Sequence, residues 1–104
     1  MVFIESTIFT ADVRSILSED DYRELQIYLS DNPDAGDVIK DSGGLRKIRW
    51  KAKGKGKSGG ARVIYYYLVD ASQIRMLLIY TKGVREDITA AEKKILRQLN
   101  SSWG

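Results

Sequence analysis

The chain has 104 residues, of which 43% are hydrophobic and 30% are charged, and this size and composition are typical of one small globular domain. It contains no cysteine and no histidine, which excludes disulfides, thiolate chemistry and the usual transition-metal ligands. We therefore expect a single domain over residues 1–104 with no metal and no other cofactor. No stretch approaches the roughly 20 apolar residues of a membrane span, and the first residues lack the pattern of a secretory signal, so we expect a cytoplasmic protein that contacts no membrane.

The first third of the chain predicts a strand followed by two helices. The apolar residues 2–4 are typical of a short strand, and Thr7 is placed to cap a helix that runs to about Leu17. Ser18 is placed to cap the next helix, whose first turn is acidic, as the helix dipole favours. This second helix ends at Asn32-Pro33, because proline cannot continue a helix.

A basic strand and a glycine-rich loop follow. Residues 45–50 alternate in polarity as a half-buried strand does, which places Lys47, Arg49 and Lys51 on one face of a sheet and apolar side chains on the other. Residues 51–60 contain four lysines and four glycines and are typical of a hairpin loop.

Two more strands and a helix complete the predicted fold. Residues 62–69 form a run of β-branched and aromatic side chains typical of a central strand, and residues 74–81 predict its hairpin partner, so three consecutive strands are antiparallel. Thr89 and Glu92 form a capping box that begins the last helix. Its predicted apolar stripe consists of Ile95, Leu96, Leu99 and Trp103. The predicted fold is α+β, a small antiparallel sheet with two N-terminal helices and one C-terminal helix.

Charge is segregated along the chain. Between Asp41 and Asp70 there are eight basic residues and no acidic one, although the formal charge of the chain is only +3. Residues 1–41 carry ten acids against three bases. The basic segment predicts salt-dependent binding of nucleic acid through counterion release, and the acidic region predicts either a solvated helix face or a docking surface for a second kind of partner.

Three motifs carry a family resemblance: LRKIR at residues 45–49, GGARVIYY at residues 59–66 and LLIYTK at residues 77–82. With the glycine–lysine loop and the capped last helix, they make the chain resemble the RelE-like toxins of type II toxin–antitoxin modules, particularly the HigB branch. The resemblance covers essentially the whole chain in matching element order. It implies a ribosome-dependent endoribonuclease that cuts mRNA in the ribosomal A site and is neutralised by a cognate helix-turn-helix antitoxin similar to HigA.

The resemblance also implies where the site residues lie. Catalytic groups of the family are mostly basic side chains on the concave face of the sheet, and the matching positions here are Lys47, Arg49, Arg62 and Lys82. The RNA-binding residues that we expect are Arg46, Lys53, Lys55, Lys57, Tyr80 and Arg85, with Tyr80 as the side chain that stacks on a base. Several family members use histidine or tyrosine near the C-terminus for proton transfer, whereas this chain has no histidine and no tyrosine after Tyr80.

Basic residues can serve every step of RNA cleavage by 2′-OH attack on the adjacent phosphate. Arginine forks fit phosphate oxygens, so we assign Arg49 and Arg62 to clamping the scissile phosphate. Lys47 or Lys82 is then the acid or base, because neighbouring like charges favour the neutral amine. A site without histidine is expected to be slow on free RNA and to depend on the ribosome for substrate alignment.

Two other functions remain open from the sequence. A non-catalytic nucleic-acid-binding or translation-inhibiting module would keep the same basic face without cleaving RNA. A small DNA-binding regulator would need base-reading residues on a helix, and residues 89–99 offer few.

Overall fold

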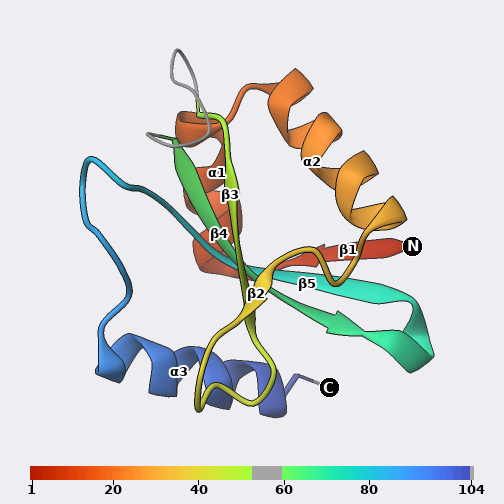
Figure 1. The fold of residues 1–104 in the computed structure, drawn as a ribbon, viewed down its shortest axis with the longest axis vertical. Coiled ribbons are helices and arrows are strands. Elements are labelled where there is room, and N and C mark those ends of the chain that lie inside the picture. Colours follow the sequence, from red (N-terminus) through yellow and green to blue (C-terminus); the bar gives the residue numbers. More distant parts are fainter. Residues whose placement is uncertain (53–59, 104) are drawn as a thin grey trace.

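The computed structural model describes residues 1–52 and 60–103, and over these residues it is an α+β fold of a five-stranded sheet and three α-helices (Figure 1). The elements in chain order are β1 Val2–Glu5, α1 Thr7–Ile16, α2 Glu19–Asp31, β2 Asp37–Val38, β3 Arg46–Trp50, β4 Ala61–Leu68, β5 Gln73–Thr81 and α3 Ala90–Ser101. The predicted fold class is confirmed. None of the helices in the described part of the chain is long and apolar enough to cross a membrane.

The sheet has the strand order β1-β5-β4-β3-β2. Strands β3, β4 and β5 pair antiparallel, as the sequence predicts, and β4 lies at the centre. Two features differ from the prediction. Strand β1 pairs parallel with β5, so the sheet is mixed rather than antiparallel, and the two-residue β2 adds an edge strand beside β3.

Side-chain caps fix where the helices begin. Helix α1 is capped by Ser6 rather than by Thr7: the Ser6 Oγ accepts a hydrogen bond from the backbone N–H of Phe9 (3.1 Å) and donates one to the carbonyl of Leu77 on β5 (2.7 Å). The second bond makes Ser6 the better cap, because it ties the helix start to the sheet. Ser18 caps α2, as predicted.

The two faces of the sheet are covered differently. Helices α1 and α2 pack on one face through fully buried side chains, which include Phe9, Leu25, Leu29, Val63 and Tyr65. Helix α3 begins with the predicted capping box and packs on the other face, where Leu96 lies among Leu45, Ile64, Leu77 and Leu78. The apolar stripe of α3 is narrower than predicted, because Ile95 is 58% exposed.

The connection between α2 and β2 is held by a buried hydroxyl. The Tyr65 hydroxyl donates to the carbonyl of Pro33 (2.9 Å) and accepts from the N–H of Gly36 (2.8 Å). The Arg46 guanidinium donates to the carbonyl of Gly36 (2.8 Å). Gly36 has no room for a side chain, since an added Cβ would lie 2.8 Å from Tyr65 Cε1. These contacts fix residues 33–36 beside the edge of β3.

Candidate nucleic-acid interface

A row of polar side chains crosses three strands on the face that α3 covers in part. Arg49 on β3 lies directly opposite Arg62 on β4, and Arg62 lies opposite Tyr80 on β5. Side chains of direct cross-strand partners share a face, with Cβ atoms roughly 5 Å apart. Lys47 lies on the same face because it is two residues before Arg49. Like charges directly opposite each other destabilise a sheet, and an anion bound between them relieves the repulsion.

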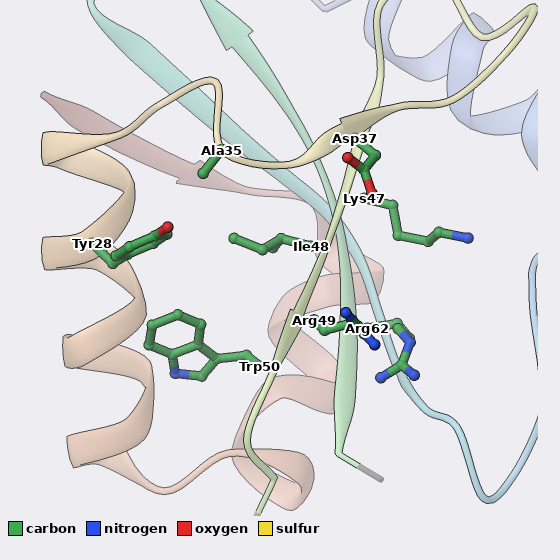
Figure 2. Close-up of a pocket in the computed structure, with 8 residues that line it drawn as sticks. All are labelled: Tyr28, Ala35, Asp37, Lys47, Ile48, Arg49, Trp50 and Arg62. Carbon is green, nitrogen blue, oxygen red and sulfur yellow. The ribbon is translucent and has the colours of Figure 1, made fainter. Parts of the chain in front are cut away.

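The two arginines and Lys47 line a pocket of about 510 Å³ at the edge of β3 (Figure 2). Its lining consists of Tyr28, Ala35, Asp37, Lys47, Ile48, Arg49, Trp50 and Arg62. Figure 2 shows that β3 divides the lining, with the aromatic and aliphatic side chains on one side of the strand and the three cations on the other. The pocket therefore joins a positive wall to an apolar one.

Asp87 forms an ion pair with the Lys47 amine. Its Oδ1 lies 3.3 Å from Lys47 Nζ and accepts a hydrogen bond from the Tyr80 hydroxyl at 3.5 Å. Partial burial alone would raise the pKa of Asp87, but hydrogen bonds from the Ile88 N–H and from Lys47 outweigh it and hold the pKa below its usual value. Lys47 therefore has an ionised carboxylate beside it, and not only the like charges that the sequence led us to expect.

No pattern in the sequence identifies Asp87, because it lies 40 residues from Lys47 in a loop before α3. Only the packing of that loop on the sheet brings the two side chains together.

Tyr80 is a buried member of the row. It is 5% exposed, and the Arg85 guanidinium lies 4.6 Å from the centre of its ring and forms an ion pair with Glu92. Burial raises the pKa of Tyr80 and the Asp87 carboxylate raises it further, while Arg85 and Arg62 oppose the shift only in part. The phenol is therefore protonated at neutral pH. Its burial leaves little ring surface for the base stacking predicted from the sequence.

A second cleft, of about 450 Å³, extends the basic surface toward the start of α3. Its lining shares Asp37 and Lys47 with the first pocket and adds Lys40 and Lys93. The Lys93 Nζ donates to the carbonyl of Lys40 at 3.0 Å, which joins α3 to the segment before β3. The two clefts therefore meet at Asp37 and Lys47.

Two basic residues of the predicted surface have structural partners instead. Arg46 points to the opposite face of the sheet from Lys47, and its guanidinium holds the α2–β2 connection. Lys51 leaves the predicted row, because its amine pairs with Glu24 (3.0 Å) and Asp21 (3.5 Å) of α2. The alternation of β3 ends at Trp50, so extending the row to Lys51 was wrong.

The remaining predicted residues lie at the border of the site. Lys82 is exposed just beyond the end of β5, where its N–H donates to the carbonyl of Gly60 (3.2 Å), and it is not part of the pocket lining. The loop lysines Lys53, Lys55 and Lys57 lie outside the described residues.

A scan of the chain against models of known protein families finds no match. The case for a function therefore rests on the motifs of the sequence and on the geometry of this site.

Proposed function

We propose that this protein is a RelE-like toxin of the HigB branch, a ribosome-dependent endoribonuclease of the cytoplasm that cleaves mRNA in the ribosomal A site. One observation carries the proposal: Lys47, Arg49 and Arg62, which the motifs assign to catalysis, come from two strands and line one pocket. The α+β fold that the resemblance implies is also present.

The reaction needs little more than positioned cations. The 2′-oxygen of the RNA attacks the adjacent phosphorus, the P–O5′ bond breaks, and the products are a 2′,3′-cyclic phosphate and a 5′-hydroxyl. Negative charge grows on the non-bridging oxygens as the phosphorane forms, and in this proposal the guanidinium groups of Arg49 and Arg62, which line one pocket, donate hydrogen bonds to those oxygens.

Lys47 is the proton donor in this proposal. The leaving 5′-oxygen takes up a proton, and the ammonium of Lys47, which pairs with Asp87, can supply one. Asp87 acts through Lys47 and is therefore a positioning residue. Lys82, outside the pocket lining, is the second lysine of the predicted set and our candidate for the base that accepts the 2′-OH proton.

In this proposal the enzyme depends on the ribosome because the site does not itself align the RNA for attack. A single acid or base typically contributes about 10²- to 10⁴-fold, and alignment of the attacking 2′-oxygen with the leaving group contributes more. The pocket offers phosphate clamps but is open at the edge of the sheet, so in this proposal the ribosome supplies the alignment. The phosphates of the ribosomal RNA are the polyanion that the basic surface of this protein binds in the proposal.

The proposed second partner is a cognate helix-turn-helix antitoxin similar to HigA. The acidic first turn of α2, which carries Glu19, Asp20 and Asp21, is our candidate for part of its docking surface. Lys51 already pairs with this acidic region, so charges of both signs are available there.

The test is cleavage of a defined mRNA bound to ribosomes, with new 5′ ends mapped by primer extension and naked mRNA treated in parallel. We expect ends only in the ribosome lane. Arg49→Ala, on an exposed side chain, and Arg62→Met, which keeps the buried stem, should each slow cleavage about 10²- to 10³-fold. Arg23→Ala is the matched control, because it removes an exposed arginine of α2 that lies outside the pocket lining.

The outcomes separate the two main functions. Cleavage in neither lane, with RNA binding that weakens gradually as charges are removed, would replace the enzyme with a non-catalytic binding module. Cleavage by both arginine variants at the rate of the wild type would remove these residues from the catalytic set. Urea denaturation of each variant shows whether the fold is intact.

A further inference from the structure

The apolar wall of the pocket carries an aromatic ring that the proposed chemistry does not use. Tyr28, near the end of α2, is 40% exposed, and its ring centre lies 5.4 Å from that of Trp50, which is buried. Figure 2 shows both rings on the same side of β3, across that strand from Arg49 and Arg62. Trp50 is held by a hydrogen bond from its Nε1 to the carbonyl of Asp21 (3.0 Å), so it backs Tyr28 with a fixed surface.

The edge of β3 beside this wall is open. Ile39 donates its N–H to the carbonyl of Leu45, so the odd-numbered residues of β3 direct their backbone groups toward β2. Strand β2 begins at Asp37, which pairs with Lys47, so the pairing of β2 with β3 does not reach Arg49. In the described part of the sheet no strand pairs with Arg49 on that side, and its N–H and C=O therefore face the pocket.

The Tyr65 hydroxyl is what keeps that edge open. Continued pairing in the same register would bring Ala35 opposite Arg49. Because the Tyr65 hydroxyl holds Pro33 and Gly36, the chain turns at these residues and Ala35 lines the pocket instead of closing it. The Asp37 carboxylate lines the same pocket from the other side of β3, because Asp37 is the direct cross-strand partner of Lys47 and shares its face.

We infer that this pocket receives a nucleobase of the RNA strand next to the scissile phosphate, stacked on Tyr28 and with its hydrogen-bonding edge toward the backbone N–H and C=O of Arg49. Aromatic rings stack on any base, and backbone donors and acceptors at a base edge discriminate among bases. Lys47, Arg49 and Arg62 line the same pocket across β3 and are the groups that would hold the adjoining phosphate. The inference rests on the proposed function for the identity of the ligand as RNA, and it makes α2 and β3 the source of base preference.

Binding of nucleoside 3′-monophosphates tests this without ribosomes and without cleavage. In a Trp103→Phe background, Trp50 is the one remaining tryptophan, and its fluorescence and indole N–H signal report on the pocket. We expect nucleotides to change both signals and inorganic phosphate to leave them unchanged. Tyr28→Ala should weaken nucleotide binding about 5- to 150-fold, the loss expected for one base–aromatic stack, whereas Tyr28→Phe should keep most of the affinity.

Two further variants complete the test. Asp37→Asn removes a negative charge beside Lys47 and should strengthen binding of the four nucleotides without changing their order of affinity. Ile27→Ala, at the neighbouring exposed position of α2 and outside the pocket lining, should bind as the parent does. The inference is overturned if no nucleotide changes the Trp50 signals, if phosphate changes them equally, or if Tyr28→Ala binds unchanged. Nucleotide binding without any ribosome-dependent cleavage would keep this pocket and reject the nuclease instead.

Discussion

The two faces of this sheet are made by the same three long strands but have different tasks. One face is covered by α1 and α2, and the side chains between these helices and the sheet, such as Phe9 of α1 and Val63 of β4, are fully buried apolar groups. The other face is apolar only where α3 packs on Ile64 and Leu78, and farther along the strands it carries Arg49 and Arg62. Alternation along a strand allows this, because each residue serves only one face.

The comparison shows how a small protein can keep a charged site stable. Clustered cations repel one another and oppose folding, so apolar burial elsewhere must offset them. Here the α1–α2 face provides that burial over the same strands. Changes to the apolar face should therefore alter stability, and changes to the charged end should alter function.

Phe9→Ala should have the largest effect on stability. Phe9 is 0% exposed and packs against Tyr22 of α2, with ring centres 5.8 Å apart, so its loss should cost about 3–5 kcal/mol of unfolding free energy. Urea denaturation measures this, and cleavage per folded molecule should stay unchanged. A fully stable variant, or a folded but inactive one, would contradict the division of tasks between the faces.

Tyr65→Phe changes a residue that serves both regions, because Tyr65 belongs to the apolar face but holds the rim of the pocket. Loss of its hydroxyl leaves the N–H of Gly36 and the carbonyl of Pro33 without their partner and should cost about 1–3 kcal/mol. It should also weaken nucleotide binding, as the Trp50 signal reports. Tyr67→Phe, on the same strand, is the control. Equal effects of the two substitutions would show that the hydroxyl does not hold the rim.

Thr89→Ala probes the cover of the second face. The Thr89 Oγ1 accepts the N–H of Glu92 at 3.1 Å, and its removal should cost about 0.5–2 kcal/mol. Because Asp87 lies just before this cap, the substitution should also loosen the contact between Asp87 and Lys47. Urea denaturation measures the loss of stability. The NMR signal of the Asp87 carboxyl measures the change in its contact with Lys47. An unchanged stability would mean that the capping box contributes little to holding α3 on the sheet.

The smallest expected effect is a pH dependence of the contact between Asp87 and Lys47. The folded pKa of Asp87 lies below its usual value, so the contact contributes stability above the unfolded pKa and loses it as pH falls through the folded pKa. Titration of the Asp87 carboxyl signal should show a higher pKa in Lys47→Ala than in the wild type. The same pKa in both proteins would mean that the backbone N–H of Ile88 alone stabilises the carboxylate.

Local signals in the sequence predicted much of this fold. The cap at Ser18, the box at Thr89 and Glu92 and the three antiparallel strands depend on neighbouring residues, and all were found as predicted. The cap at Ser6 was missed, because its preference over Thr7 depends on Leu77, 71 residues away. Strand β2 was missed because two residues carry no periodicity.

The site could be predicted only in part for the same reason. Lys47, Arg49 and Arg62 share a face because of strand alternation and register, which a sequence can indicate. Asp87 and Tyr28 reach the pocket region through packing of a loop and of a helix on the sheet, and neither position has a local signal.

The close approach of Gly36 to Tyr65 has a consequence for how this sequence can change. Glycine is required at position 36 by its neighbour, because an added Cβ would lie only 2.8 Å from the ring at position 65. A larger residue at position 36 therefore needs a smaller one at position 65, and that exchange removes the hydroxyl that shapes the pocket. In a library randomised at both positions, the surviving sequences should covary, and those that leave this glycine–tyrosine pair should keep their fold more often than their base preference.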